Sequence, residues 1–198
     1  MQIRRLKGWT GLFCCLLLLL ALHQLGSAGL IVAKARFAQV LIGGAWHRTL
    51  QSGGAVVKPW PWADTWPVAR LEVPRLSVDL LVLWGAQGNS LAFAPGYEPA
   101  SAIPGHSGVT VIGGHRDTHF EFLRDIELNT LLRMQLPSGE NVSYRVSDMH
   151  VVDIDQNPYL SLNSESSALI LVTCYPFDAL LPGGPLRYVV TAITDIQH

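Results

Sequence analysis

An uncharged, strongly apolar segment near the N-terminus constrains this chain most. It covers residues 8–33 and is almost pure leucine over residues 13–22. A run of about 20 apolar residues is long enough to cross a bilayer as a helix, which satisfies its own backbone hydrogen bonds. Arg4, Arg5 and Lys7 precede the run, and a basic flank is held on the cytoplasmic side. The sequence therefore predicts a membrane helix that directs the rest of the chain outward.

Two fates of this segment are compatible with the sequence. Gly26-Ser27-Ala28 is a weak match to a signal-peptidase site, so the segment is either a removed signal peptide or an uncleaved anchor. Helical apolar spacing continues over residues 31–42 and favours an anchor followed by a stalk helix. We expect residues 1–33 to form a cytoplasmic basic end and anchor, residues 34–67 a stalk and linker, and residues 68–198 one folded domain.

The remainder of the chain has the pattern of an all-β domain. Roughly 150 residues remain after the first forty, the usual size of one domain. The chain contains 18 Gly and 12 Pro without periodicity, which is typical of many turns, and its net charge of -1 disfavours binding to polyanions. Helical spacing is limited to residues 120–128, and residues 137–140 read as a hairpin turn. Short apolar runs predict strands at residues 70–73, 78–84, 108–113, 131–136, 143–153, 169–173 and 186–191.

A segment rich in proline and tryptophan, residues 53–67, precedes the first predicted strand. It cannot hold a regular helix. We expect Trp60, Trp62 and Trp66 to pack this linker onto the edge of the domain, and a platform for carbohydrate or peptide is the alternative.

Three polar residues lie at the ends of predicted strands and complement one another chemically. His115 follows one strand, Cys174 follows another, and Arg187 opens the last. A thiolate is a good nucleophile, an imidazole exchanges protons with it and with a leaving amine, and a guanidinium stabilises an oxyanion. Cys14 and Cys15 lie in the apolar run, so Cys174 is the one cysteine outside it. These residue types predict acyl transfer, provided that the fold brings the three together.

The residues around this trio resemble the sortase family of cysteine transpeptidases. The resemblance rests on Gly-Gly-His-Arg at 113–116, Leu-Val-Thr-Cys at 171–174 and Leu-Arg-Tyr-Val-Val at 186–190, in the family's order, and it extends over residues 66–193. The segment 60–67, with Cys-Tyr-Pro-Phe at 174–177, is similar to the sortases of class GN, a subgroup of the family that occurs in Gram-negative bacteria.

The resemblance implies both a fold and an activity. The fold would be an eight-stranded β-barrel with short helices. Cys174 would be the nucleophile, His115 the acid and Arg187 the oxyanion partner. The substrate would be a secreted protein with a Leu-Pro-x-Thr-Gly-like sorting signal. The enzyme would cleave this signal between Thr and Gly and transfer the protein to an amine. The enzyme would lie in the bacterial inner membrane with its catalytic domain facing the periplasm. The loop 175–185 is either a plain connection or a wall of the substrate groove, and its length and its place between Cys174 and Arg187 favour the wall. No cofactor or metal is implied.

Several alternatives compete with this interpretation. Cys174 and His115 are structural residues in one of them, and Arg187 is a surface ion-pair partner in another. His119 or His106 would replace His115 as the acid, or His115, Asp117 and His119 would bind zinc through their alternate spacing. At the level of function, the alternatives are another Cys/His peptidase, such as an L,D-transpeptidase, and a non-catalytic anchored β-domain in envelope assembly.

Overall fold

The computed structural model describes residues 2–88, 90–156, 167–179 and 183–195. The chain divides into two compact units, Met1–Val40 and Leu41–His198, and each is described by itself. The helices are α1 (Gln2–Gln51) and the short 3₁₀ helices η1 (Pro74–Leu76), η2 (Ser90–Ala92) and η3 (Glu121–Arg124). The strands are β1 (Pro67–Val73), β2 (Val78–Trp84), β3 (Gly96–Tyr97), β4 (Val109–Gly113), β5 (Leu131–Gln135), β6 (Asn141–Asp153), β7 (Ala168–Cys174) and β8 (Leu186–Thr194).

The first unit consists of the N-terminal part of α1. Between Phe13 and Val40 its large apolar side chains are exposed. Exposed leucine over many consecutive turns is unfavourable in water and is typical of a helix surrounded by lipid. By length and composition, residues Phe13–Gln51 are able to cross a membrane. The predicted N-terminal apolar helix is therefore present.

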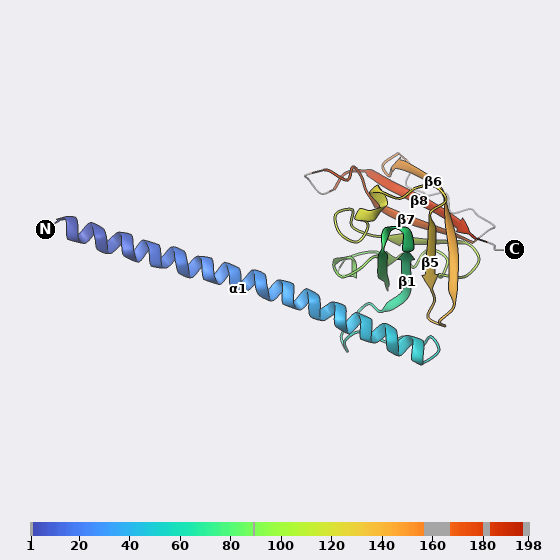
Figure 1. The fold of residues 1–198 in the computed structure, drawn as a ribbon, viewed down its shortest axis with the longest axis horizontal. Helices are drawn as coiled ribbons and strands as arrows, with labels where there is room; N and C mark the ends of the chain where they lie inside the picture. Colours follow the sequence, from blue (N-terminus) through green and yellow to red (C-terminus); the bar gives the residue numbers. More distant parts are fainter. Residues whose placement is uncertain (1, 89, 157–166, 180–182, 196–198) are drawn as a thin grey trace. The chain divides into compact units, whose positions relative to one another are not determined.

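The second unit contains a closed barrel, as the sequence predicted. Its strands follow the order β1-β2-β3-β4-β7-β8-β6-β5, and Figure 1 labels β1, β5, β6, β7 and β8. Every strand predicted from the sequence overlaps an observed one, and the predicted hairpin at residues 137–140 joins β5 to β6. The sequence missed β3, because two residues are too few to show an alternating pattern. The helix expected over residues 120–128 was wrong in extent, since only η3 forms there.

The register of the strands brings several strand ends to one end of the barrel. β4 and β7 are parallel, with Gly113 opposite Val172, so both strands finish at the same level. β8 is antiparallel to β7 and therefore begins where β7 ends. We call this the site end of the barrel: the ends of β4 and β7 and the start of β8.

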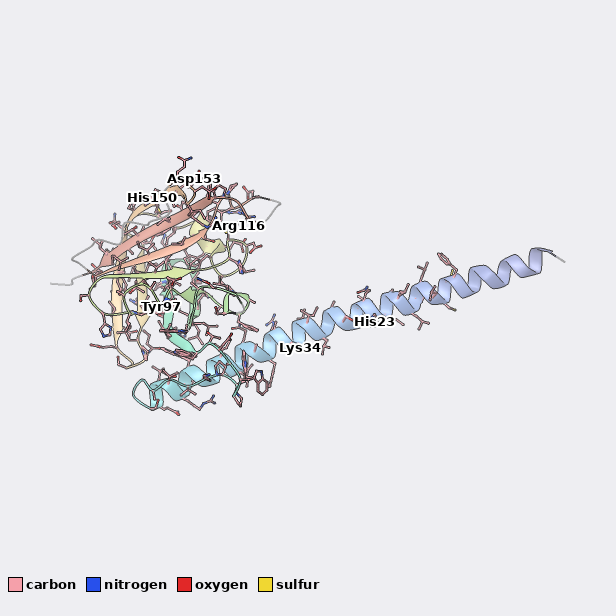
Figure 2. All side chains as sticks on the ribbon, turned by 180° about the vertical axis from the view of Figure 1, so that it is seen from behind. His23, Lys34, Tyr97, Arg116, His150 and Asp153 are labelled. Atoms are coloured by element: carbon pink, nitrogen blue, oxygen red, sulfur yellow. The ribbon has the colours of Figure 1, made fainter. Side chains whose placement is uncertain are left out.

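Alternating side chains fill the interior of the barrel. In β1 every second residue from Pro67 to Val73 is buried, which is the period of a strand with one face in a core. Leu71, Leu132 and Leu169 are fully buried, and burying such a side chain stabilises the fold by about 1.5–3 kcal/mol. Tyr97, labelled in Figure 2, is also buried, and its hydroxyl donates to the Ser101 carbonyl at 2.9 Å.

The tryptophan-rich linker packs on the barrel through two of its three rings. Trp66 stacks on Trp84 with ring centroids 4.9 Å apart, and Trp60 meets Phe93 edge to face at 5.7 Å. Trp62 is 82% exposed. The packing prediction is confirmed for Trp60 and Trp66 and wrong for Trp62, whose ring points to solvent.

Candidate active site

Cys174 and Arg187 are partners across one antiparallel ladder. They are the last aligned pair between β7 and β8, and Figure 1 shows the two strands side by side. One residue further on, the Tyr175 amide donates to the Leu186 carbonyl at 3.0 Å. Directly opposed residues in an antiparallel pair have Cβ atoms about 4.5–5.5 Å apart. The sheet itself therefore places the Cβ atoms of Cys174 and Arg187 side by side, and both residues are half-buried.

His115 reaches the same place from β4. The Gly114 amide donates to the Val172 carbonyl at 3.1 Å, and the Thr173 hydroxyl donates to the Gly114 carbonyl at 2.8 Å. These two bonds extend the contact between β4 and β7 to Gly114, one residue beyond the end of β4. On β7 the contact extends to Thr173, the residue before Cys174. His115 follows at once and is exposed. The three residues predicted from the sequence thus come from three adjacent strands at the site end.

The Arg187 side chain bonds to carbonyls of the segment before β8. Its Nη1 donates to the Gly184 carbonyl at 2.6 Å and to the Leu186 carbonyl at 2.9 Å. Within the described part of the chain, Arg187 has no ion pair with a carboxylate. The alternative of a surface ion-pair partner therefore gains no support from these contacts.

The other two histidines considered as acids lie in different surroundings. His106 is exposed and precedes β4, whereas His115 follows it, so His106 lies toward the opposite end of the barrel. His119 is half-buried near His115. Burial lowers the pKa of His119, the charge of His115 lowers it further, and Asp117 opposes the shift. No group of three His, Cys, Asp or Glu side chains suited to a metal ion occurs among the described residues.

An aromatic cluster beside Cys174 escaped the sequence analysis. Tyr175, Phe177 and Tyr188 meet pairwise, with ring centroids 5.4–6.2 Å apart. Two members come from the turn after Cys174 and one from β8, next to Arg187. Burial raises the pKa of Tyr188, and neighbouring Tyr175 raises it further. The aromatic residues following Cys174 were visible in the sequence, but the contribution of Tyr188 depends on the β7–β8 register.

The turn after Cys174 is also tied to the segment that carries His115. Arg116 Nη2 donates to the Ala179 carbonyl at 2.7 Å. Arg124 forms an ion pair with Asp178 at 3.0 Å and lies over the Phe177 ring at 5.5 Å. Of the expected groove wall at residues 175–185, residues 180–182 lie outside the described residues.

Comparison with known proteins identifies the family of the chain. The family model "Sortase domain" matches residues 71–195, which include all three candidate site residues. The chain belongs to the sortase family. Sortase D of Bacillus subtilis (strain 168) is 33% identical over 120 residues, which is 61% of this chain. The match spans 60% of the length of that sortase.

Solved sortases share the fold at lower sequence identity. Sortase A from Corynebacterium diphtheriae superposes with a TM-score of 0.61 and 20% identity, over 81% of this chain and 85% of that one. A Clostridium perfringens sortase D5 transpeptidase gives a TM-score of 0.63 and 15% identity, over 81% and 99% of the two chains. These likenesses confirm the sortase barrel fold predicted from the sequence.

Proposed function

We propose that this sortase is a membrane-anchored cysteine transpeptidase that cleaves a Leu-Pro-x-Thr-Gly-like sorting signal between Thr and Gly. The observation that carries the proposal is the pairing of Cys174 with Arg187 across β7 and β8, with His115 one residue beyond the β4–β7 contact. A nucleophile, a proton donor and an oxyanion partner at one end of a barrel are sufficient for acyl transfer. The fold and the family support this chemistry.

Each residue has a separate role in the proposed reaction. The Cys174 thiolate attacks the threonyl carbonyl carbon, and Arg187 stabilises the oxygen that becomes negative. His115 gives a proton to the glycine nitrogen as the carbon–nitrogen bond breaks, which leaves a thioester on Cys174. A second amine then attacks the thioester, loses its proton to His115 and releases the thiolate. Protons and bonds balance over the two steps, and no cofactor takes part.

The half-buried Arg187 side chain keeps hydrogen-bond donors that suit a peptide substrate. Two N–H groups of Arg187 are directed to Gly184 and Leu186, and the guanidinium offers further donors at Nη2 and Nε. Tyr175, next to Cys174 in the chain, joins a ring cluster with Phe177 and Tyr188, which pack against the barrel core and so brace the turn that follows the nucleophile.

The N-terminal helix would hold the enzyme in the bacterial inner membrane as a single-pass anchor. Its apolar side chains are exposed over many turns, and basic residues precede it. By the positive-inside rule, the catalytic barrel would face the periplasm. The substrate would be a secreted protein held at the same membrane surface. Membership of class GN and the division into anchor (1–33), stalk and linker (34–67) and catalytic barrel (68–198) belong to the same proposal.

The test uses the full-length protein in detergent with a sorting-signal peptide and an amine acceptor. Wild type is expected to form a thioester that mass spectrometry locates on Cys174, and to release the glycine-containing fragment. Cys174→Ala is expected to abolish both, because the nucleophile is lost while a small residue remains. His115→Ala is expected to reduce turnover about 10²- to 10⁴-fold, the usual contribution of a positioned proton donor.

Two other thiols provide the matched control. The variant carrying Cys14→Ala and Cys15→Ala removes the thiols of the N-terminal helix and is expected to keep wild-type turnover. Turnover by a folded Cys174→Ala protein would overturn the proposal. A wild-type protein that forms no thioester with any peptide of this class would favour the non-catalytic alternative.

A further inference from the structure

We propose that Arg116 is a positioning residue that ties the segment carrying His115 to the turn after Cys174, and so sets the placement of the imidazole relative to the thiol. The inference rests on the proposed function and deepens it. Arg116 is the chain neighbour of His115, and its hydrogen-bond acceptor, the Ala179 carbonyl, lies five residues after Cys174. Figure 2 labels Arg116 on the barrel.

His115 needs such a tie because the sheet stops one residue before it. The last main-chain bond between this segment and β7 is made by the Gly114 amide, and the Thr173 hydroxyl holds the Gly114 carbonyl. On its far side, the His115 carbonyl accepts a bond from the Phe120 amide at 2.9 Å. That bond joins the segment to the buried Phe120 but makes no contact with the turn after Cys174. The imidazole itself is exposed.

The Arg116 contact is suited to this task by its strength and its partner. It is short, at 2.7 Å, and its donor is a charged guanidinium. Hydrogen bonds from charged donors are stronger than neutral ones, and Arg116 is half-buried, which reduces competition from water. The acceptor is main chain, so the bond fixes the path of the turn rather than one mobile side chain.

A second, weaker tie runs parallel to it. Arg124 in η3 pairs with Asp178 and lies over Phe177 in the same turn. The side chains of Arg124 and Asp178 are 48% and 88% exposed, so solvent screens their attraction. Both arginines lie between β4 and β5. Together they contact three consecutive residues of the turn after Cys174, namely Phe177, Asp178 and Ala179, and the contact made by Arg116 is the less exposed one.

The contacts also separate Arg116 from Arg187. Arg187 is the second residue of β8 and lies directly opposite Cys174, whereas Arg116 Nη2 donates to the Ala179 carbonyl in the turn after Cys174. Arg116 therefore acts through His115 and the turn, and Arg187 is the residue placed to meet the substrate.

A double-mutant cycle on the full-length protein tests this assignment. It uses the Cys14→Ala, Cys15→Ala background and two readouts: turnover of the sorting-signal peptide and the rate of Cys174 alkylation by iodoacetamide. Arg116→Met is expected to lower kcat about 10- to 100-fold, the effect of one charge-assisted bond. It is expected to leave the melting temperature within a few degrees. Combined with His115→Ala, the same change is expected to have less than about a twofold further effect, since residues that act through one another are not additive.

The controls make each outcome decisive. Arg133→Met removes an exposed arginine from β5 and is expected to match wild type in both readouts. Arg116→Gln, a milder change, decides the question if Arg116→Met does not fold, and its loss is expected to be smaller and in the same direction. Wild-type turnover in a folded Arg116→Met or Arg116→Gln protein would overturn the inference, as would losses that simply multiply with those of His115→Ala. If His115→Ala alone changed neither readout, the proposed function would fail first.

Discussion

The site end of the barrel combines two kinds of positioning. Cys174 and Arg187 lie opposite each other in a regular ladder, held by the backbone bonds of β7 and β8 over seven aligned pairs. His115 lies just beyond a strand, in a segment held by Gly114, by the buried Phe120 and by arginine side chains. The first pair is fixed by secondary structure, and the third residue is fixed by tertiary contacts. The difference predicts that the two halves of the site respond differently to substitution.

The largest effect among the tests of this contrast is expected at Arg187. Lys supplies a compact charge on a flexible stem, whereas Arg offers several donors in a fixed fork. Arg187→Lys is therefore expected to reduce turnover of the sorting-signal peptide about 10²- to 10³-fold, the range for loss of one oxyanion donor. The β7–β8 ladder does not depend on this side chain, so the melting temperature is expected to change little.

The opposite pattern would contradict the role given to Arg187. Early melting with normal turnover of the remaining folded enzyme would make Arg187 a structural residue that organises Gly184 and Leu186, the carbonyls that it binds. Steady-state kinetics and a thermal melt on the same preparation distinguish the two results.

Substitution of Gly114 tests whether tertiary contacts fix the position of His115. A Cβ at Gly114 would lie 2.7 Å from Cγ of the fully buried Phe120 ring, so the ring or the main chain must shift. Gly114→Ala is expected to destabilise the protein by about 1–3 kcal/mol, the usual result of overpacking. It is also expected to lower turnover, because the main chain next to His115 must shift. Denaturant unfolding and peptide turnover provide the two measurements.

The neighbouring glycine is the matched control. A Cβ at Gly113 would meet the Ala86 Cβ at 3.7 Å, an ordinary van der Waals distance. Gly113→Ala is expected to keep near-wild-type stability and turnover. Equal losses in both variants would mean that the strand end, rather than the contact with Phe120, controls the placement of His115.

The same contrast explains how much the sequence could predict. Short apolar runs locate β2, β7 and β8 closely, and polar residues at strand ends are candidates for a site, so Cys174 and Arg187 were proposed from the pattern and its resemblance to a family, and the register places them opposite each other. The contact from Arg116 to Ala179 joins residues far apart in the chain, and no periodicity reports such a bond. The exposure of Trp62 and the brevity of η3 were also missed, since both depend on which neighbours the fold supplies.

The smallest expected effect concerns His119, which lies near His115 in the segment fixed by tertiary contacts. Burial holds the pKa of His119 below its ordinary value, and the charge of His115 adds to this effect. The unfolded chain, with an ordinary histidine pKa near 6.5, then binds a proton more readily than the folded chain. As far as His119 is concerned, the free energy of unfolding is therefore fully retained above about pH 6.5 and falls as the pH drops below this value.

His119→Gln, which cannot titrate, is expected to reduce the loss of melting temperature between pH 7.5 and pH 5.5 relative to wild type. An unchanged pH dependence would show that the folded protein accommodates a charged His119, and the segment after His115 would then be more open than the buried contacts of Phe120 imply.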